Sequence, residues 1–193
     1  MVSISFTICV PAGSEEDPEI VDEEDTEVME YLDVISAWFY ELEEEPGYLF
    51  TAIKMKEINP YHFKQHLHIH WNYNDTPCAA GMIIGYGDPW FDFSAGYGHG
   101  WWFQEHYVRI EGTYDNETGI VTCKIPKSII KNPQKGDVLE DTYASAFERF
   151  GFIGRLGFDR PIIRLILYMI TGKNVVDYAP ESTDYGRDYI IQY

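Results

Sequence analysis

The chain has 193 residues, of which 45% are hydrophobic and 16% aromatic, and its formal net charge at pH 7 is −18. This length suits a single domain with a full core, and the hydrophobic content excludes a disordered chain. The negative charge would repel phosphates and anionic headgroups, which argues against nucleic acid and membrane surfaces as partners. It is uneven, because residues 1–50 hold 15 acidic side chains and no Lys or Arg. No stretch reaches the roughly 18 apolar residues of a membrane span.

The first half of the chain predicts a loop followed by a series of strands. Residues 11–30 are broken by Pro and Gly, and their acidic run has no apolar period, which indicates a loop. Four strands follow, predicted from β-branched and aromatic content and from alternation of apolar with polar residues. They cover residues 34–41, 48–57, 66–74 and 78–86.

The second half predicts a hairpin, a long strand, a helix and a final strand. Strands at 107–113 and 120–125 flank the polar turn Asp115–Gly119, whose residue types tolerate a left-handed backbone. A third strand runs from Asp137 to about residue 150. Asp159 and Pro161 open, and Gly172 closes, an apolar run at 162–171, which has the start and stop signals of a helix. Residues 186–193 are predicted as a last strand.

These elements amount to about eight to ten strands, with turn signals about every 8 to 12 residues and no alternation of strands with helices. The sequence therefore predicts one all-β domain over residues 1–193, with an acidic loop at 11–30 and a helical insertion at about 160–172. The expected architecture is a two-sheet antiparallel β-sandwich or jelly roll with one short helix near the C-terminus.

Four short motifs are shared with a known type of β-sandwich. Residues 121–130 end a strand in Ile-Pro-Lys-Ser-Ile-Ile, and residues 132–137 read Asn-Pro-Gln-Lys-Gly-Asp; segments 32–39 and 185–189 also fit. The chain thus resembles the DOMON and family 9 carbohydrate-binding-module type of domain. The resemblance implies a non-catalytic accessory domain of an extracellular or cell-surface protein, as found in archaea. Such a domain would bind carbohydrate or stabilise its parent or partner protein, and would hold structural calcium.

Aromatic residues gather in the glycine-rich stretch 85–103. Rings beside flexible glycine loops form flat platforms on which sugars stack, with a few polar groups to orient them. The alternative is that these rings fill the core of a large sandwich. The candidate ligand-binding residues are Tyr86, Trp90, Tyr97, Trp101 and Trp102. Gly98-His99-Gly100 favours an exposed loop around Trp101 and Trp102.

Three histidines share one face of the strand predicted at 66–74. Leu67, Ile69 and Trp71 point to one face, and His66, His68 and His70 point to the other. A His-x-His pair on a strand can supply two imidazoles to zinc, with a third ligand from His70 itself, Glu105 or His106. This pattern leaves open a metal-binding module or metalloenzyme. The other interpretation is an outward face on which histidine is simply a polar residue that tolerates strands.

Acidic residues near the chain ends offer oxygen ligands for calcium, which binds well in flexible loops. The candidates are Asp22, Asp25, Asp33 and Asp188. They do not have the spacing of an EF-hand, and a solvated acidic surface explains them equally well.

The remaining motifs favour a non-catalytic protein without excluding an enzyme. We find no nucleophile elbow, phosphate loop, zinc-protease or dinucleotide motif. Cys9, Cys78 and Cys123 cannot all pair with one another, so one disulfide or free thiols remain open. Residues 1–10 lack the basic start of a signal peptide, whereas Asn-x-Thr sequons at 74–76 and 116–118 favour an extracellular location. A structural role, in which the helix at 162–171 docks on a partner protein, is a further alternative.

Overall fold

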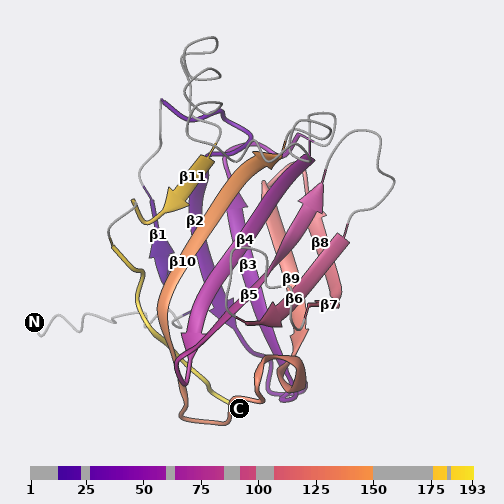
Figure 1. Cartoon of the computed structure of the whole chain (residues 1–193), viewed down its shortest axis with the longest axis vertical. Helices are drawn as coiled ribbons and strands as arrows, with labels where there is room; N and C mark the ends of the chain where they lie inside the picture. Colours follow the sequence, from indigo (N-terminus) through magenta and orange to yellow (C-terminus); the bar gives the residue numbers. More distant parts are fainter. Residues whose placement is uncertain are drawn as a thin grey trace, which may run out of the picture.

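The structure is a computed structural model that describes residues 13–22, 27–59, 64–84, 92–98, 107–149, 176–181 and 184–193. This part of the chain forms two antiparallel sheets packed face to face (Figure 1). The predicted all-β sandwich is therefore confirmed. The helix predicted at about 160–172 lies outside the described residues. Among the described residues, no helix is long and apolar enough to cross a membrane.

The smaller sheet has five strands in the order β1-β2-β3-β9-β8. These strands are β1 (Ile20–Val21), β2 (Val34–Tyr40), β3 (Tyr48–Met55), β9 (Ile120–Pro126) and β8 (Glu111–Asp115). The predictions for β2, β3 and β9 hold to within two residues. The prediction of a loop throughout 11–30 is wrong at β1, where Ile20 pairs with Ala37. A two-residue strand is too short to show a period, and it forms here because Ile20 is fully buried.

The larger sheet has the order β11-β10-β4-β5-β6-β7, and β12 also pairs with β10. Its strands are β11 (Val176–Ala179), β10 (Val138–Arg149), β4 (Lys64–Tyr73), β5 (Thr76–Ile84), β6 (Asp92–Tyr97), β7 (Val108–Arg109) and β12 (Tyr189–Ile190). β6 lies inside the stretch that we predicted as an aromatic, glycine-rich loop. β7 pairs with β6 whereas β8 pairs with β9, so the strand predicted at 107–113 is divided between the two sheets.

The described residues hold twelve strands, more than predicted, because β1, β6 and β11 were not predicted and the strand predicted at 107–113 is divided into β7 and β8. The last strand, predicted over 186–193, is reduced to β12. Its Tyr189 ring lies 5.5 Å from the Phe39 ring of β2, and Phe39 meets Trp71 of β4 edge to face at the same distance. Aromatic packing of this kind joins the two sheets and the C-terminal tail in one core.

Two of the three cysteines lie in this core as free thiols. Cys78 and Cys123 are both 1% exposed and unpaired, and burial raises the pKa of each to about 12. They are therefore protonated and unreactive in the folded protein. Cys9 lies outside the described residues.

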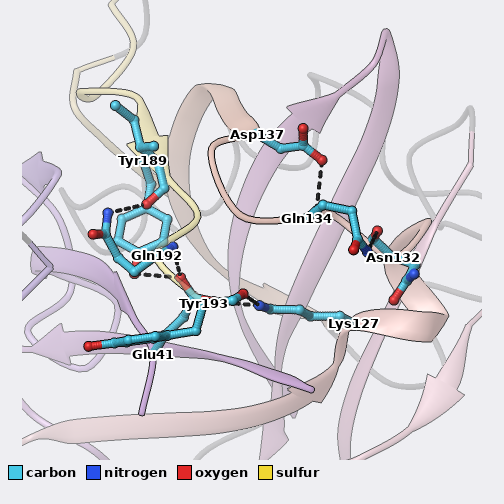
Figure 2. Close-up of polar contacts among 9 residues, drawn as sticks. Glu41, Lys127, Asn132, Gln134, Asp137, Tyr189, Gln192 and Tyr193 are labelled. Carbon is cyan, nitrogen blue, oxygen red and sulfur yellow. Dashed lines mark hydrogen bonds and ion pairs between the residues drawn. The ribbon is translucent and has the colours of Figure 1, made fainter. Parts of the chain in front are cut away.

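A buried ion pair ties the end of the chain to the small sheet (Figure 2). Lys127, the first residue of a 3-10 helix (Lys127–Ile130), places its Nζ 2.5 Å from Oε1 of Glu41 and 2.5 Å from the carbonyl oxygen of Tyr193. The other carboxylate oxygen of Glu41 accepts hydrogen bonds from the Gln192 backbone N–H at 2.5 Å and the Tyr189 hydroxyl at 3.3 Å. We call Glu41, Lys127, Tyr189, Gln192 and Tyr193 the C-terminal clamp.

A second buried carboxyl lies where the tail crosses β1 and β2. Glu19 is 4% exposed, and its Oε2 accepts a hydrogen bond from the Phe39 backbone N–H at 2.9 Å. Its own carbonyl accepts the Arg187 backbone N–H at 2.8 Å. Burial raises the pKa of the Glu19 carboxyl from 4.5 to about 7, and the Phe39 hydrogen bond and the Arg187 charge offset only part of this effect.

Glu19 therefore predicts a pH-dependent stability. Because the pKa of Glu19 is higher in the folded state, the protonated carboxyl favours folding. Its contribution to the free energy of unfolding is complete below about pH 4.5 and is lost as the pH rises through about 7. Glu19→Gln cannot titrate at this position. We therefore expect its free energy of unfolding, relative to that of the wild type, to increase by about 1–3 kcal/mol as the pH rises from about 5 to about 8.5. Urea unfolding of both proteins at each pH measures this difference. If the free energy of unfolding changed with pH by the same amount in both proteins, the raised pKa of Glu19 would be contradicted.

Candidate functional site

The structure describes one of the five aromatic residues predicted to bind a ligand. Tyr97 ends β6, and Lys131 places its Nζ 4.0 Å from the centre of the ring. This cation–π contact covers one face of the ring, which is then not open for stacking against a sugar. The other four, Tyr86, Trp90, Trp101 and Trp102, lie outside the described residues.

The three histidines of β4 lie, as predicted, on the face opposite Leu67, Ile69 and Trp71. The alternative of a solvated polar face is wrong, since His66 is 4% exposed and His70 is 9% exposed. Alternation along the strand identified the face correctly. It could not show that His66 and His70 are buried on this second face and that His68 between them is half-buried.

Aromatic rings of β10 pack against the outer two histidines. The His66 ring stacks on Phe147 at 4.7 Å between centres, and the His70 ring stacks on Tyr143 at 4.3 Å. The Nε2 atom of His70 also lies 3.0 Å from Oγ of Ser145.

His68 lies between the other two histidines, with ring centres 5.8 Å from His66 and 5.9 Å from His70. Its Cδ2 atom lies over Gly81 of β5, where a Cβ atom would come within 2.2 Å. Burial lowers the pKa of His68 to about 4 and that of His70 well below 6.5, so both rings are neutral at pH 7.

These contacts account for the positions of the three rings by packing, but Nε2 of His68 is buried and has no hydrogen-bond partner among the described residues. Neutral imidazole is also the form that ligates metals, but among the described residues no group of three His, Cys, Asp or Glu side chains is arranged to hold a metal ion. Glu105 and His106, the other predicted ligands, lie outside the described residues. The zinc site thus gains no support beyond its sequence pattern.

The aspartates predicted to bind calcium do not all come together. Asp22 and Asp33 lie at the start of β2, where the Asp22 backbone N–H donates to the Ile35 carbonyl oxygen and Asp33 precedes Val34. Asp188 precedes Tyr189, whose hydroxyl bonds to Glu41 beyond the other end of β2. The length of a seven-residue strand, about 20 Å, separates the two ends. Asp25 lies outside the described residues.

The ring contacts of His70 continue towards the surface through two tyrosines that the sequence analysis did not single out as ligand-binding residues. Tyr143 of β10, which stacks on His70, is partly exposed. The Tyr185 ring lies 6.3 Å from the Tyr143 ring at an angle of 53° and is 60% exposed. Tyr185 belongs to the motif 185–189, but nothing in that motif indicates which ring is exposed.

Backbone contacts hold both tyrosines in place. Next to Tyr185, the Gly186 backbone N–H donates to the Thr142 carbonyl oxygen at 2.7 Å. A Cβ atom on Gly186 would lie 2.7 Å from the Glu19 carbonyl oxygen, so this close approach requires glycine. The register of β10 against β4 shifts between Glu140 and Tyr143, and this bulge directs Tyr143 onto His70.

Polar side chains flank the two rings. Asn72 lies on the same face of β4 as His70, about 7 Å further along the strand. Its Nδ2 donates to Oδ2 of Asp141 in the β10 bulge at 2.8 Å. β4 and β10 lie side by side in Figure 1. We call Tyr143, Tyr185, Asn72 and Asp141 the tyrosine site.

Comparison with known proteins gives no match: no family model, no curated protein and no solved structure matches this chain. The resemblance to DOMON-type domains therefore stays a prediction. The case for a function depends on the geometry of the tyrosine site.

Proposed function

We propose that this chain is a non-catalytic accessory β-sandwich of an extracellular or cell-surface protein, and that it binds carbohydrate at the tyrosine site. The observation that carries this proposal is the Tyr185 ring, which is 60% exposed beside Tyr143. Tyr185 lies outside the strands but beside the large sheet, and exposed aromatic faces held in this way are groups on which the C–H face of a sugar stacks.

The polar part of the site suits the same class of ligand. The Asn72 carboxamide both donates and accepts hydrogen bonds, and the Asp141 carboxylate accepts them. Sugar hydroxyls do both, so this pair can orient a ring that stacks on the tyrosines. The neutral His70 beneath Tyr143 adds no charge to the site. With the Asp141 carboxylate in the site, an uncharged, hydroxyl-rich ligand fits better than an anionic one.

Loss of one ring tests the proposal. We expect Tyr185→Ala to bind the best soluble oligosaccharide found on a glycan array at least tenfold more weakly than wild type, which corresponds to about 1.4 kcal/mol. Titration calorimetry measures this change. Tyr107→Ala is the matched control, because this tyrosine is 39% exposed beside β7 at the opposite edge of the sheet.

Equal unfolding midpoints of the two variants would show that the comparison reports on the site and not on the fold. A wild-type protein that binds no oligosaccharide on a broad array would contradict the carbohydrate role and leave the structural or interaction domain. Equal affinity of Tyr185→Ala and wild type would place the ligand elsewhere on the chain.

A further inference from the structure

The proposed function leaves two Asn-x-Thr motifs unused, and the structure places both at the tips of hairpins. Asn74-Asp75-Thr76 joins β4 to β5, and Asn116-Glu117-Thr118 joins β8 to β9. We propose that Asn116 is an acceptor for an N-linked oligosaccharide and that Asn74 is a much poorer one. This inference rests on the extracellular location in the proposed function, because the transfer takes place outside the cytoplasm.

The second motif is accessible over its whole length. Asn116, Glu117 and Thr118 are all exposed. The turn is held by the Gly119 backbone N–H on the Asp115 carbonyl oxygen at 2.9 Å and by the Glu117 N–H on Oδ1 of Asp115 at 2.8 Å. Neither of these two hydrogen bonds uses the Asn116 carboxamide. Because all three residues of the motif are exposed, a transferase can reach the Asn116 carboxamide that it must modify.

The first motif is constrained by its tight turn. Asn74 and Asp75 have φ of +50° and +57°, and the next residue, Thr76, already belongs to β5 and is paired with Tyr73. The Thr76 hydroxyl lies 3.4 Å from the Asn74 carbonyl oxygen. A transferase would have to break the end of the β4–β5 pairing to bind this motif, which is why we expect low occupancy.

The chemistry needs no group beyond a lipid-linked sugar donor. Nδ2 of Asn116 forms a bond to the anomeric carbon of an oligosaccharide carried on a lipid phosphate or pyrophosphate. The bond between that carbon and the phosphate oxygen breaks, and the lipid phosphate leaves. The carboxamide loses one proton to a base of the transferase. Neither oxidation nor reduction occurs.

The position also gives the modification a physical consequence. β8 is an edge strand of the small sheet, and edge strands pair readily with other chains. A bulky, hydrated oligosaccharide at Asn116, at the tip of the β8–β9 hairpin, would hinder such pairing and keep the protein in solution.

To test this proposal, the full chain is expressed with a cleavable signal peptide that directs it into the secretory pathway of a glycosylating host. A flexible tail carrying one extra Asn-x-Thr motif reports whether the machinery acted on the molecule. Intact mass and glycopeptide mapping should show nearly full occupancy at Asn116 and less than about a third of that at Asn74. Asn116→Gln should lose this oligosaccharide, and so should Thr118→Val, which keeps the asparagine. Asn74→Gln should keep it.

A modified tail together with an unmodified Asn116 would overturn the proposal, and so would equal occupancy at Asn74 and Asn116. Unchanged unfolding midpoints in the variants would show that lost occupancy is not lost folding. Carbohydrate binding at the tyrosine site is measured on protein without the modification. The failure of one proposal is therefore distinguishable from the failure of the other.

Discussion

Replacing Lys127 by Met is expected to lower the free energy of unfolding by about 3–5 kcal/mol, among the largest effects of any single change in this protein. The side chains of Lys127 and Glu41 are 4% and 0% exposed, so the substitution leaves a carboxylate buried without its cation. It also removes the donor to the Tyr193 carbonyl oxygen and so frees the end of the tail. Urea unfolding followed by tryptophan fluorescence measures the loss.

Two further variants separate the buried charge from simple loss of contacts. Lys127→Met combined with Glu41→Leu removes both charges, and we expect it to recover the part of the loss that comes from the unpaired carboxylate, although the hydrogen bonds to the tail remain lost. Lys124→Met breaks the half-buried ion pair between Lys124 and Glu45, whose charges both reach solvent, and should change stability far less. A single Lys127→Met variant as stable as the Lys124→Met control would contradict the clamp.

Gly81→Ala is expected to destabilise the protein by about 3 kcal/mol, because the added methyl group meets backbone atoms that cannot turn away. A Cβ atom at this position would lie 2.0 Å from the Leu67 carbonyl oxygen and 2.8 Å from Cα of His68. It would also meet the His68 ring, so β4 and β5 must separate inside the large sheet. Thermal and urea unfolding both measure the effect.

Gly47→Ala is the matched control for this change. Gly47 lies in the turn between β2 and β3, and a Cβ atom there meets nothing within 4 Å. We expect its stability to stay within about 0.5 kcal/mol of wild type. Equal effects of the two substitutions would show that β5 does not pack against β4 as closely as the structure has it.

Much of the fold could be predicted because its signals are local. The alternation of His66 to Asn72 with Leu67 to Trp71 predicted β4 and its two faces, and β2, β3 and β9 followed from β-branched and aromatic runs. The turn Asp115–Gly119 was readable from residue types that tolerate a left-handed backbone, and Gly119 indeed has φ of +73°. β6 was missed because glycine and aromatic residues suggested a loop.

The candidate site could not be predicted in the same way. Tyr143 and Tyr185 meet only because the C-terminal segment that holds Tyr185 crosses the bulge of β10. No local sequence pattern predicts that crossing. The local pattern favoured the aromatic stretch at 85–103 instead, where Tyr97, the one candidate that the structure describes, lies under Lys131. Which ring is exposed depends on what the rest of the chain covers.

The sequence by itself determined the fold class, the main strands and the two faces of β4. Periodicity and turn chemistry act over a few residues, so they can be read from the chain directly. Only the tertiary structure decided that the histidine face is buried and that Lys127 forms a buried pair with Glu41. Burial and pairing depend on contacts between segments that are distant in the chain, and the same local pattern is compatible with a solvated or a buried environment.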